Sequence, residues 1–187
     1  MIRNTAAAVS ALALAVALVG CGSRDAPEAT PTAPSTVGTV APPAPIPAPT
    51  GKPVLTITGA VTNHNDGSAV LFDVGTLDQA ASVTTQMYDP FAKKDVSFTG
   101  VPMADLLARV GVAAGATTVH LHALDDYKIE LKAIDLADRG ILLATKVDGA
   151  RIAVSDGGPI RLVFPANSTV GKNQDLWIWS VDSINVD

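Results

Sequence analysis

The sequence predicts an α+β domain over residues 53–187, rich in β-structure, with mixed sheets and few short helices. Most apolar segments in this range alternate apolar and polar residues with a period of two, which is typical of half-buried strands. Asp-Gly pairs at 66–67 and 148–149 favour tight hairpin turns. Only one segment places its apolar residues at clear helical spacing.

The expected strands follow one another along most of this range. In the alternating run 117–124, His120 and His122 lie on the face opposite the apolar residues. Tyr127 is expected to point inward at the start of the next strand, and Trp177 and Trp179 to share one face of the last strand. The expected strands are 54–58, 69–74, 82–88, 95–99, 117–124, 127–132, 141–147, 151–155, 160–164 and 176–186.

One helix is expected between two clear signals. Pro102 suits the first position of a helix, and Gly111 suits its end. The apolar residues between them, from Met103 to Val110, recur at helical spacing. The segments 76–81 and 133–138 are expected to form short helices at most.

Composition excludes some functions. The 187-residue chain carries a formal net charge of -5, and its Lys and Arg residues are scattered. Nucleic acid is therefore not an expected partner, because phosphate binding needs clustered basic residues. The one cysteine of the chain, Cys21, cannot form an internal disulfide.

The N-terminus predicts export and a lipid anchor. Residues 1–20 carry Arg3 and then a short apolar run, as in a secretory signal peptide. The end of this run, Leu18-Val19-Gly20-Cys21, resembles a bacterial lipobox, which implies lipidation of Cys21. The predicted location is the cell envelope, outside the cytoplasm: outer membrane and periplasm, or cell surface, depending on the host. A conventional signal peptide or a short anchor helix are the alternatives.

Residues 21–52 are expected to be a lipid-anchored, disordered tether. Residues 22–52 hold eight of the thirteen prolines, with Ala and Thr filling much of the remainder. Such a composition has little to bury and favours extended polyproline structure. The alternative is that the stretch 42–49, "PPAPIPAP", is a ligand for a partner domain.

Two segments together resemble the oxidoreductase molybdopterin-binding domain, which has the sulfite-oxidase-like fold. The first, 83–111, contains "GVPMADLL", and the second, 124–165, ends in "GGPIRLVFP". The resemblance covers nearly all of 53–187. It implies a molybdenum ion held by pterin dithiolene sulfurs and a cysteine thiolate, with basic residues on the cofactor phosphate. Arg161 matches the family's arginine.

The chain departs from that family at the metal ligand. The strand that should carry the cysteine reads Thr-Thr-Gln-Met-Tyr at 84–88, and the signal lacks the twin arginines of folded export. A soft thiolate is not readily replaced by a hydroxyl or an amide. We therefore expect a cofactor-free module that binds an unknown small ligand or protein partner. No catalytic residue is assigned; the candidate cleft residues are Thr85, Gln86, Tyr88, Asp126, Tyr127, Arg161 and Trp179.

Two alternative functions stay open at this point. The first is a molybdopterin-dependent oxidoreductase with non-cysteine metal ligation. The second is a metal carrier built on His120 and His122, with Asp125 or Asp126 nearby, because two imidazoles on one strand face can begin a zinc or copper site. The competing interpretation of the histidines is a solvated strand face.

Overall fold

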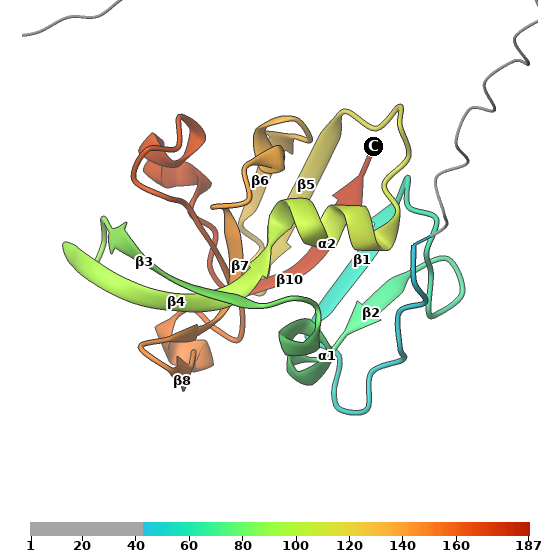
Figure 1. Cartoon of the computed structure of the whole chain (residues 1–187), viewed down its shortest axis with the longest axis horizontal. Helices are drawn as coiled ribbons and strands as arrows, with labels where there is room; N and C mark the ends of the chain where they lie inside the picture. Colours follow the sequence, from blue (N-terminus) through green and yellow to red (C-terminus); the bar gives the residue numbers. More distant parts are fainter. Residues whose placement is uncertain (1–42) are drawn as a thin grey trace, which may run out of the picture. The chain divides into compact units, whose positions relative to one another are not determined.

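The computed structural model describes residues 43–187, and the predicted signal peptide, Cys21 and the tether before residue 43 lie outside the described residues. The described part contains two five-stranded sheets and few short helices (Figure 1). One sheet mixes parallel and antiparallel pairs. The predicted β-rich α+β class with mixed sheets is therefore confirmed.

The first sheet brings the two ends of the domain together at its centre. Its strand order is β2 (Val70–Phe72), β1 (Leu55–Gly59), β10 (Val181–Val186), β5 (Thr118–Ala123) and β6 (Lys128–Lys132). The first and last strands, β1 and β10, pair in parallel, and the other neighbours are antiparallel. The fold therefore needs the C-terminal strand to complete its N-terminal half.

The second sheet is antiparallel throughout. Its strands are β3 (Val83–Asp89), β4 (Lys94–Pro102), β7 (Leu142–Val147), β8 (Ala150–Arg151) and β9 (Arg161–Val163). β4 pairs with β3 and with β7, and β7 also pairs with β8 and β9. β3 and β4 form a long hairpin that extends from the body of the domain (Figure 1).

The predicted helix is α2 (Met103–Val110), with Pro102 as its N-cap. Its apolar stripe is buried, as the helical spacing indicates. The helix ends at Gly111, whose backbone adopts the left-handed conformation with φ 69°. A Cβ at this position would lie 2.3 Å from the side-chain oxygen of Thr62, so glycine is required both for its φ and for space.

The remaining helices are short. α1 (Val74–Gln79) begins at Asp73, whose side chain accepts a hydrogen bond from the Thr76 N–H in a capping box. The four 3₁₀ turns are η1 (Asp135–Ala137), η2 (Val154–Asp156), η3 (Val170–Lys172) and η4 (Gln174–Leu176).

Three local predictions are wrong. The expected strand 151–155 is reduced to β8, because residues 154–156 turn into η2. The expected strand 176–186 begins only at Val181, since Trp177 follows a 3₁₀ turn and its indole N–H donates to the Gly171 carbonyl oxygen at 2.9 Å. Tyr127 is half-exposed rather than inward, because it belongs to the turn before β6.

Segment 43–52, which the sequence assigns to the tether, packs against the domain. Ile46 is buried in the core cluster. The backbone N–H groups of Thr50 and Gly51 donate to one carboxylate oxygen of Asp73, at 2.8 and 2.7 Å. The buried Ile46 side chain and the two hydrogen bonds to Asp73 thus help to hold this proline-rich segment against the domain.

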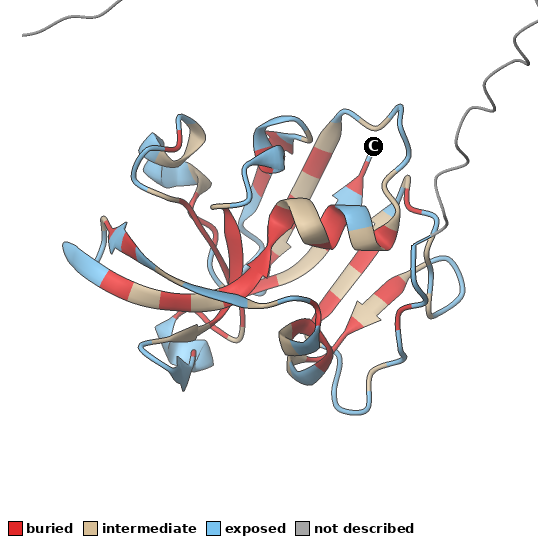
Figure 2. Cartoon of the chain, in the orientation of Figure 1, coloured by how far each residue is buried: buried red, intermediate tan, exposed pale blue. Residues whose placement is uncertain are grey.

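The core is one continuous cluster of buried apolar side chains. In Figure 2 the buried residues alternate with intermediate or exposed ones along several strands, such as β1, β5 and β6. The aromatic side chains among the largest fully buried ones are Phe72, Phe98 and Phe164, which come from elements of both sheets and the segment after β9. Within residues 43–187 no helix has the length and apolar character needed to cross a membrane.

Candidate functional site

A buried ion pair joins the end of β3 to the start of β9. The Arg161 guanidinium donates through Nη2 to Oδ2 of Asp89 at 2.7 Å, and both side chains are buried. The other carboxylate oxygen of Asp89 accepts hydrogen bonds from the backbone N–H groups of Phe91 and Ala92. Asp89 therefore closes the β3–β4 turn and neutralises Arg161 at the same time.

Aromatic rings lie over the guanidinium of Arg161. Its Cζ is 4.8 Å from the ring centroid of Phe98 and 5.5 Å from that of Trp179, both within cation–π range. Its Nε has no hydrogen-bond partner among the described side chains and backbone. Arg161 is thus held by one charge-assisted hydrogen bond and two aromatic rings, and its buried Nε is left without a partner.

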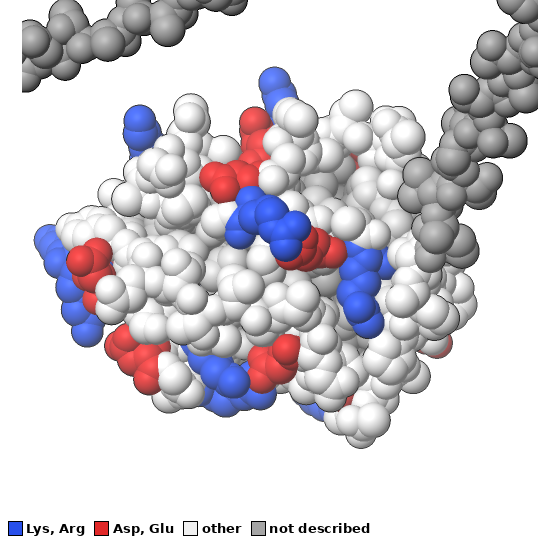
Figure 3. Space-filling view, viewed as in Figure 1, with Lys and Arg blue, Asp and Glu red and all other residues white. Residues whose placement is uncertain are grey.

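A cavity of about 360 Å³ adjoins this ion pair. Charged residues of both signs line it, in equal number: Asp89, Asp148, Asp156, Lys94, Arg151 and Arg161. No excess of positive charge therefore develops at its walls. The same mixing is visible on the face of Figure 3, where cations and carboxylates lie beside each other on a mostly uncharged surface.

A second, smaller cavity of about 250 Å³ is lined mainly by aromatic side chains, and we call it the aromatic pocket. Phe91 packs edge-on against the rings of Trp177 and Trp179, with centroids 6.0 and 5.2 Å apart. Tyr127 also lines the pocket, and its hydroxyl donates to the backbone carbonyl oxygen of Asp175 at 2.7 Å. The remaining lining residues are Asp125, Gln174 and Asp175.

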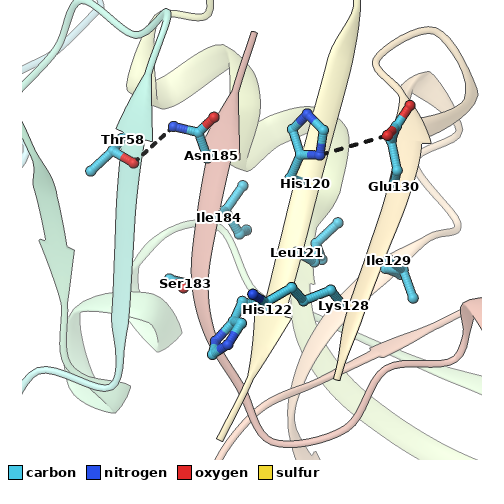
Figure 4. A pocket seen from close by; sticks show the side chains of 10 residues that line it. All are labelled: Thr58, His120, Leu121, His122, Lys128, Ile129, Glu130, Ser183, Ile184 and Asn185. Atoms are coloured by element: carbon cyan, nitrogen blue, oxygen red, sulfur yellow. Dashed lines mark hydrogen bonds and ion pairs between the residues drawn. The ribbon is translucent and has the colours of Figure 1, made fainter. Parts of the chain in front are cut away.

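The outer face of the first sheet carries the two histidines of β5 in an open hollow of about 600 Å³ (Figure 4). His120 Nε2 lies 3.1 Å from an Asp187 carboxylate oxygen, and its Nδ1 lies 3.8 Å from Glu130. The two imidazoles point out of the sheet in Figure 4, as the period of two predicts.

His122 lies between two other carboxylates. Its Nδ1 is 2.8 Å from Asp182 and its Nε2 is 3.3 Å from Asp126. The hydrogen bond to Asp182 raises the pKa of His122 above its ordinary value of 6.5, and Asp126 adds to the effect. Residues 43–187 contain no group of three or more His, Cys, Asp or Glu side chains placed to hold a metal ion. The histidines therefore have separate carboxylate partners rather than a common centre.

The structure separates the predicted cleft residues into three places. Arg161 and Trp179 are in contact, and Tyr127 joins Trp179 at the aromatic pocket. Asp126 lies instead beside His122 on the outer face of the first sheet.

The predicted residues of β3 lie apart from these pockets. Gln86 and Tyr88 are exposed, while Met87 and Asp89 between and after them are buried. Because side chains alternate along a strand, Gln86 and Tyr88 point away from the buried ion pair. Thr85 shares the side of Met87 and Asp89 and is partly buried, but it lines none of the three cavities described above.

The structure adds residues that the sequence did not single out. One signal could have found Asp89: it lies two residues after Met87 and therefore on the buried side of β3. A buried carboxylate requires a cation or several hydrogen-bond donors. No comparable signal marked Phe91 or Asp175, and Asp125 was expected beside the histidines rather than at this pocket, because the three residues come from turns that meet only in the fold.

Comparisons with known proteins agree on the scaffold. A family model described as "Oxidoreductase molybdopterin binding domain" matches residues 74–183. Among 27 matching chains of solved structures is the sulfane dehydrogenase SoxCD from Paracoccus pantotrophus, with a TM-score of 0.55 and 18% identity over 71% of this chain. The match covers 37% of that SoxCD chain, so the likeness concerns the fold of one part of a longer protein. No curated protein matches the sequence.

Proposed function

The chain belongs to the oxidoreductase molybdopterin-binding-domain family, and from this premise we propose that it uses the family scaffold as a cofactor-free module that binds a small ligand or a protein partner. The observation that carries the proposal is the buried Asp89–Arg161 ion pair. Both of its residues belong to segments that the resemblance connects with the cofactor: Asp89 directly follows residues 84–88, and Arg161 is the arginine of "GGPIR".

The available donors support this proposal. Residues 43–187 contain no cysteine. The side chains that could reach a metal ion from the cavity beside the ion pair are carboxylates, which are hard oxygen ligands. Carboxylates suit magnesium, calcium or manganese rather than a metal that is otherwise bound by soft sulfur. The donor set does not fit the metal ligation that the family uses.

The balance of charges in the cavity also supports a cofactor-free module. A molybdopterin brings a phosphate and an anionic dithiolene, and these groups require an excess of cationic donors. Here Arg161 is neutralised by Asp89, and the other cations of the cavity are matched by carboxylates. The buried Nε of Arg161 has no partner, but the charge of this guanidinium is already paired with that of Asp89. The residues present therefore do not fit a molybdenum-loaded pterin.

The proposed setting of the module is the cell envelope, with a lipid on Cys21 as the anchor and the proline-rich stretch as a spacer. Mass spectrometry of the mature protein should find a lipidated N-terminus at Cys21, and Cys21→Ser should shift the protein from the membrane to the soluble fraction. An unmodified mature N-terminus at another residue would refute the anchor while leaving the binding role intact.

Metal analysis tests the cofactor-free role. Protein purified from its own host, and a version without residues 1–20 that is kept in the cytoplasm with its cofactor pool, should both lack stoichiometric molybdenum and pterin fluorescence. Stoichiometric molybdenum with pterin in either preparation would overturn the proposal. That outcome would favour the alternative, an oxidoreductase with non-cysteine molybdenum ligation.

A further inference from the structure

Three turns that are distant in the sequence build the aromatic pocket. Phe91 comes from the β3–β4 turn, Tyr127 from the β5–β6 turn, and Trp179 from the segment before β10. In a chain with only 4% aromatic residues, these three side chains remain 44%, 44% and 38% exposed. Exposed aromatic side chains that gather around one cavity mark a recognition site more often than isolated ones do.

Hydrogen bonds keep the pocket in shape. The Tyr127 hydroxyl is bound to the Asp175 carbonyl oxygen, and the Trp177 indole N–H is bound to the Gly171 carbonyl oxygen. The backbone N–H of Asp175 donates in turn to the side chain of Asn173. Two of the four rings, Tyr127 and Trp177, are thus fixed without a ligand, which lowers the ordering cost of binding.

The pocket is negatively charged. Asp125 and Asp175 line it, no Lys or Arg does, and neither carboxylate has an ion-pair partner among residues 43–187. The guanidinium that lies against Trp179, that of Arg161, is neutralised by Asp89. Aromatic rings and carboxylates both favour a cation, and this combination of side chains is typical of sites that bind a quaternary ammonium.

We propose that the aromatic pocket binds a trimethylammonium group. The volume of about 250 Å³ suits a small head group rather than a drug-sized molecule. A quaternary ammonium makes no hydrogen bonds, so aromatic rings and carboxylates without an ion-pair partner suffice to hold it. A primary ammonium would instead have to give up a strong hydration shell, which costs binding free energy. The group can belong to a free choline-type solute or to a phosphatidylcholine head group. This inference rests on the binding role proposed above and names its ligand class.

Choline titration of the full chain carrying Cys21→Ser tests the pocket. The two tryptophans of the chain, Trp177 and Trp179, both line it, so intrinsic fluorescence reports binding directly. We expect a saturable change with choline, and binding about tenfold weaker for its neutral isostere 3,3-dimethylbutanol. Equal binding of the two compounds, or no saturable change with choline, would overturn the proposal.

Variants locate the binding at the pocket. Phe91→Ala and Asp175→Asn should each weaken choline binding by about three- to tenfold. Tyr88→Ala is the matched control, because Tyr88 is 48% exposed, lies on the same hairpin and does not line the pocket. Thermal melts verify that the variants fold. Loss of binding in Tyr88→Ala equal to that in Phe91→Ala would remove the pocket as the site.

Vesicles distinguish the two sources of the group. Phosphatidylcholine vesicles that compete with choline identify a lipid head group, whereas vesicles without effect identify a free solute. Phosphatidylglycerol vesicles serve as the control for membrane binding of other kinds. The molybdenum analysis is independent of these titrations, so a failed choline experiment and a failed cofactor-free role are distinguishable.

Discussion

The two sheets each hold an ion pair at nearly the same distance, yet the surroundings differ. On the second sheet, Arg161 and Asp89 meet at 2.7 Å with side chains only 8% and 4% exposed. On the first sheet, His122 and Asp182 meet at 2.8 Å with side chains 29% and 33% exposed. The difference teaches that the contact distance does not set the energetic role of a pair, because desolvation and screening do.

Each pair consequently does a different job. The buried pair cannot lose one partner without leaving an uncompensated charge in the core, so it is part of the framework. The exposed pair is screened by water, and it contains His122, whose pKa the hydrogen bond to Asp182 raises above 6.5. Asp73 is as buried as the first pair but is bound by N–H donors instead of a cation, and Asp78, with a side chain 22% exposed, lies between the two pairs. The loss of stability on substitution should be largest for the buried pair and should decrease from Asp73 through Asp78 to His122.

Breaking the buried pair should cost most. Arg161→Met leaves Asp89 charged and buried, and we expect the free energy of unfolding to fall by about 3–5 kcal/mol in urea denaturation. The double variant Asp89→Leu with Arg161→Met removes both charges and should recover most of this loss. A single variant that stays within about 1 kcal/mol of the wild type would contradict the framework role.

Asp73 is a buried carboxylate satisfied by N–H donors instead of a cation. It accepts from the backbone of Thr76, Gly51 and Thr50. Asp73→Ala should lower the free energy of unfolding by about 2–3 kcal/mol, because it removes both the cap of α1 and the anchor of segment 43–52. Asp73→Asn keeps the cap and should cost less. Equal losses in both variants would show that the cap contributes nothing.

Asp73 also predicts acid sensitivity. The hydrogen bonds from the backbone of Thr76 and Gly51 hold the pKa of this carboxyl well below its ordinary value of 3.8. A lowered folded-state pKa contributes stability that is complete above pH 3.8 and is lost as the pH falls below it. Urea midpoints at pH 5 and pH 3 should therefore differ more for the wild type than for Asp73→Ala.

Asp78 is the intermediate case. Its carboxylate, with a side chain 22% exposed, contacts Arg151 at 2.7 Å, Lys146 at 3.3 Å and the Thr145 hydroxyl at 2.8 Å. Burial alone would raise the pKa of Asp78, but the bonds from Arg151, Thr145 and Lys146 outweigh it and lower the pKa. Asp78→Asn should cost about 1 kcal/mol at pH 7 in urea denaturation. A cost as large as that of Arg161→Met would invalidate the ranking by burial.

His122 should give the smallest effect, visible mainly as a dependence on pH. Because the folded-state pKa is raised above 6.5, the stabilisation is complete below pH 6.5 and is lost as the pH rises through the raised value. His122→Gln should reduce the fall of the thermal midpoint between pH 6 and pH 8. His64→Gln is the control, since no carboxylate pairs with His64 among residues 43–187, and an unchanged pH profile in His122→Gln would refute the assignment.

Local patterns were sufficient for much of the fold but not for the site. The alternation over 117–124 predicted correctly which side chains of β5 are buried, because a strand with one wet face has only one register that buries its apolar residues. The strand expected at Trp177 and Trp179 was wrong, since aromatic alternation also occurs in irregular segments that are held by single hydrogen bonds, although both indoles do line one pocket. Of the predicted cleft residues, Thr85, Gln86 and Tyr88 do not line the pockets around Arg161 and Trp179.

By itself, the sequence determined the β-rich class, the single well-formed helix, the family resemblance and the absence of a thiol from residues 43–187. These properties follow from residue type and from spacing along the chain, which local sterics and hydrophobic periodicity translate directly into structure. Only the tertiary structure decided that Asp89 neutralises Arg161, and that Phe91, Tyr127 and Trp179 surround one pocket. Such contacts depend on how turns far apart in the chain are brought together by sheet pairing, for which no local signal exists.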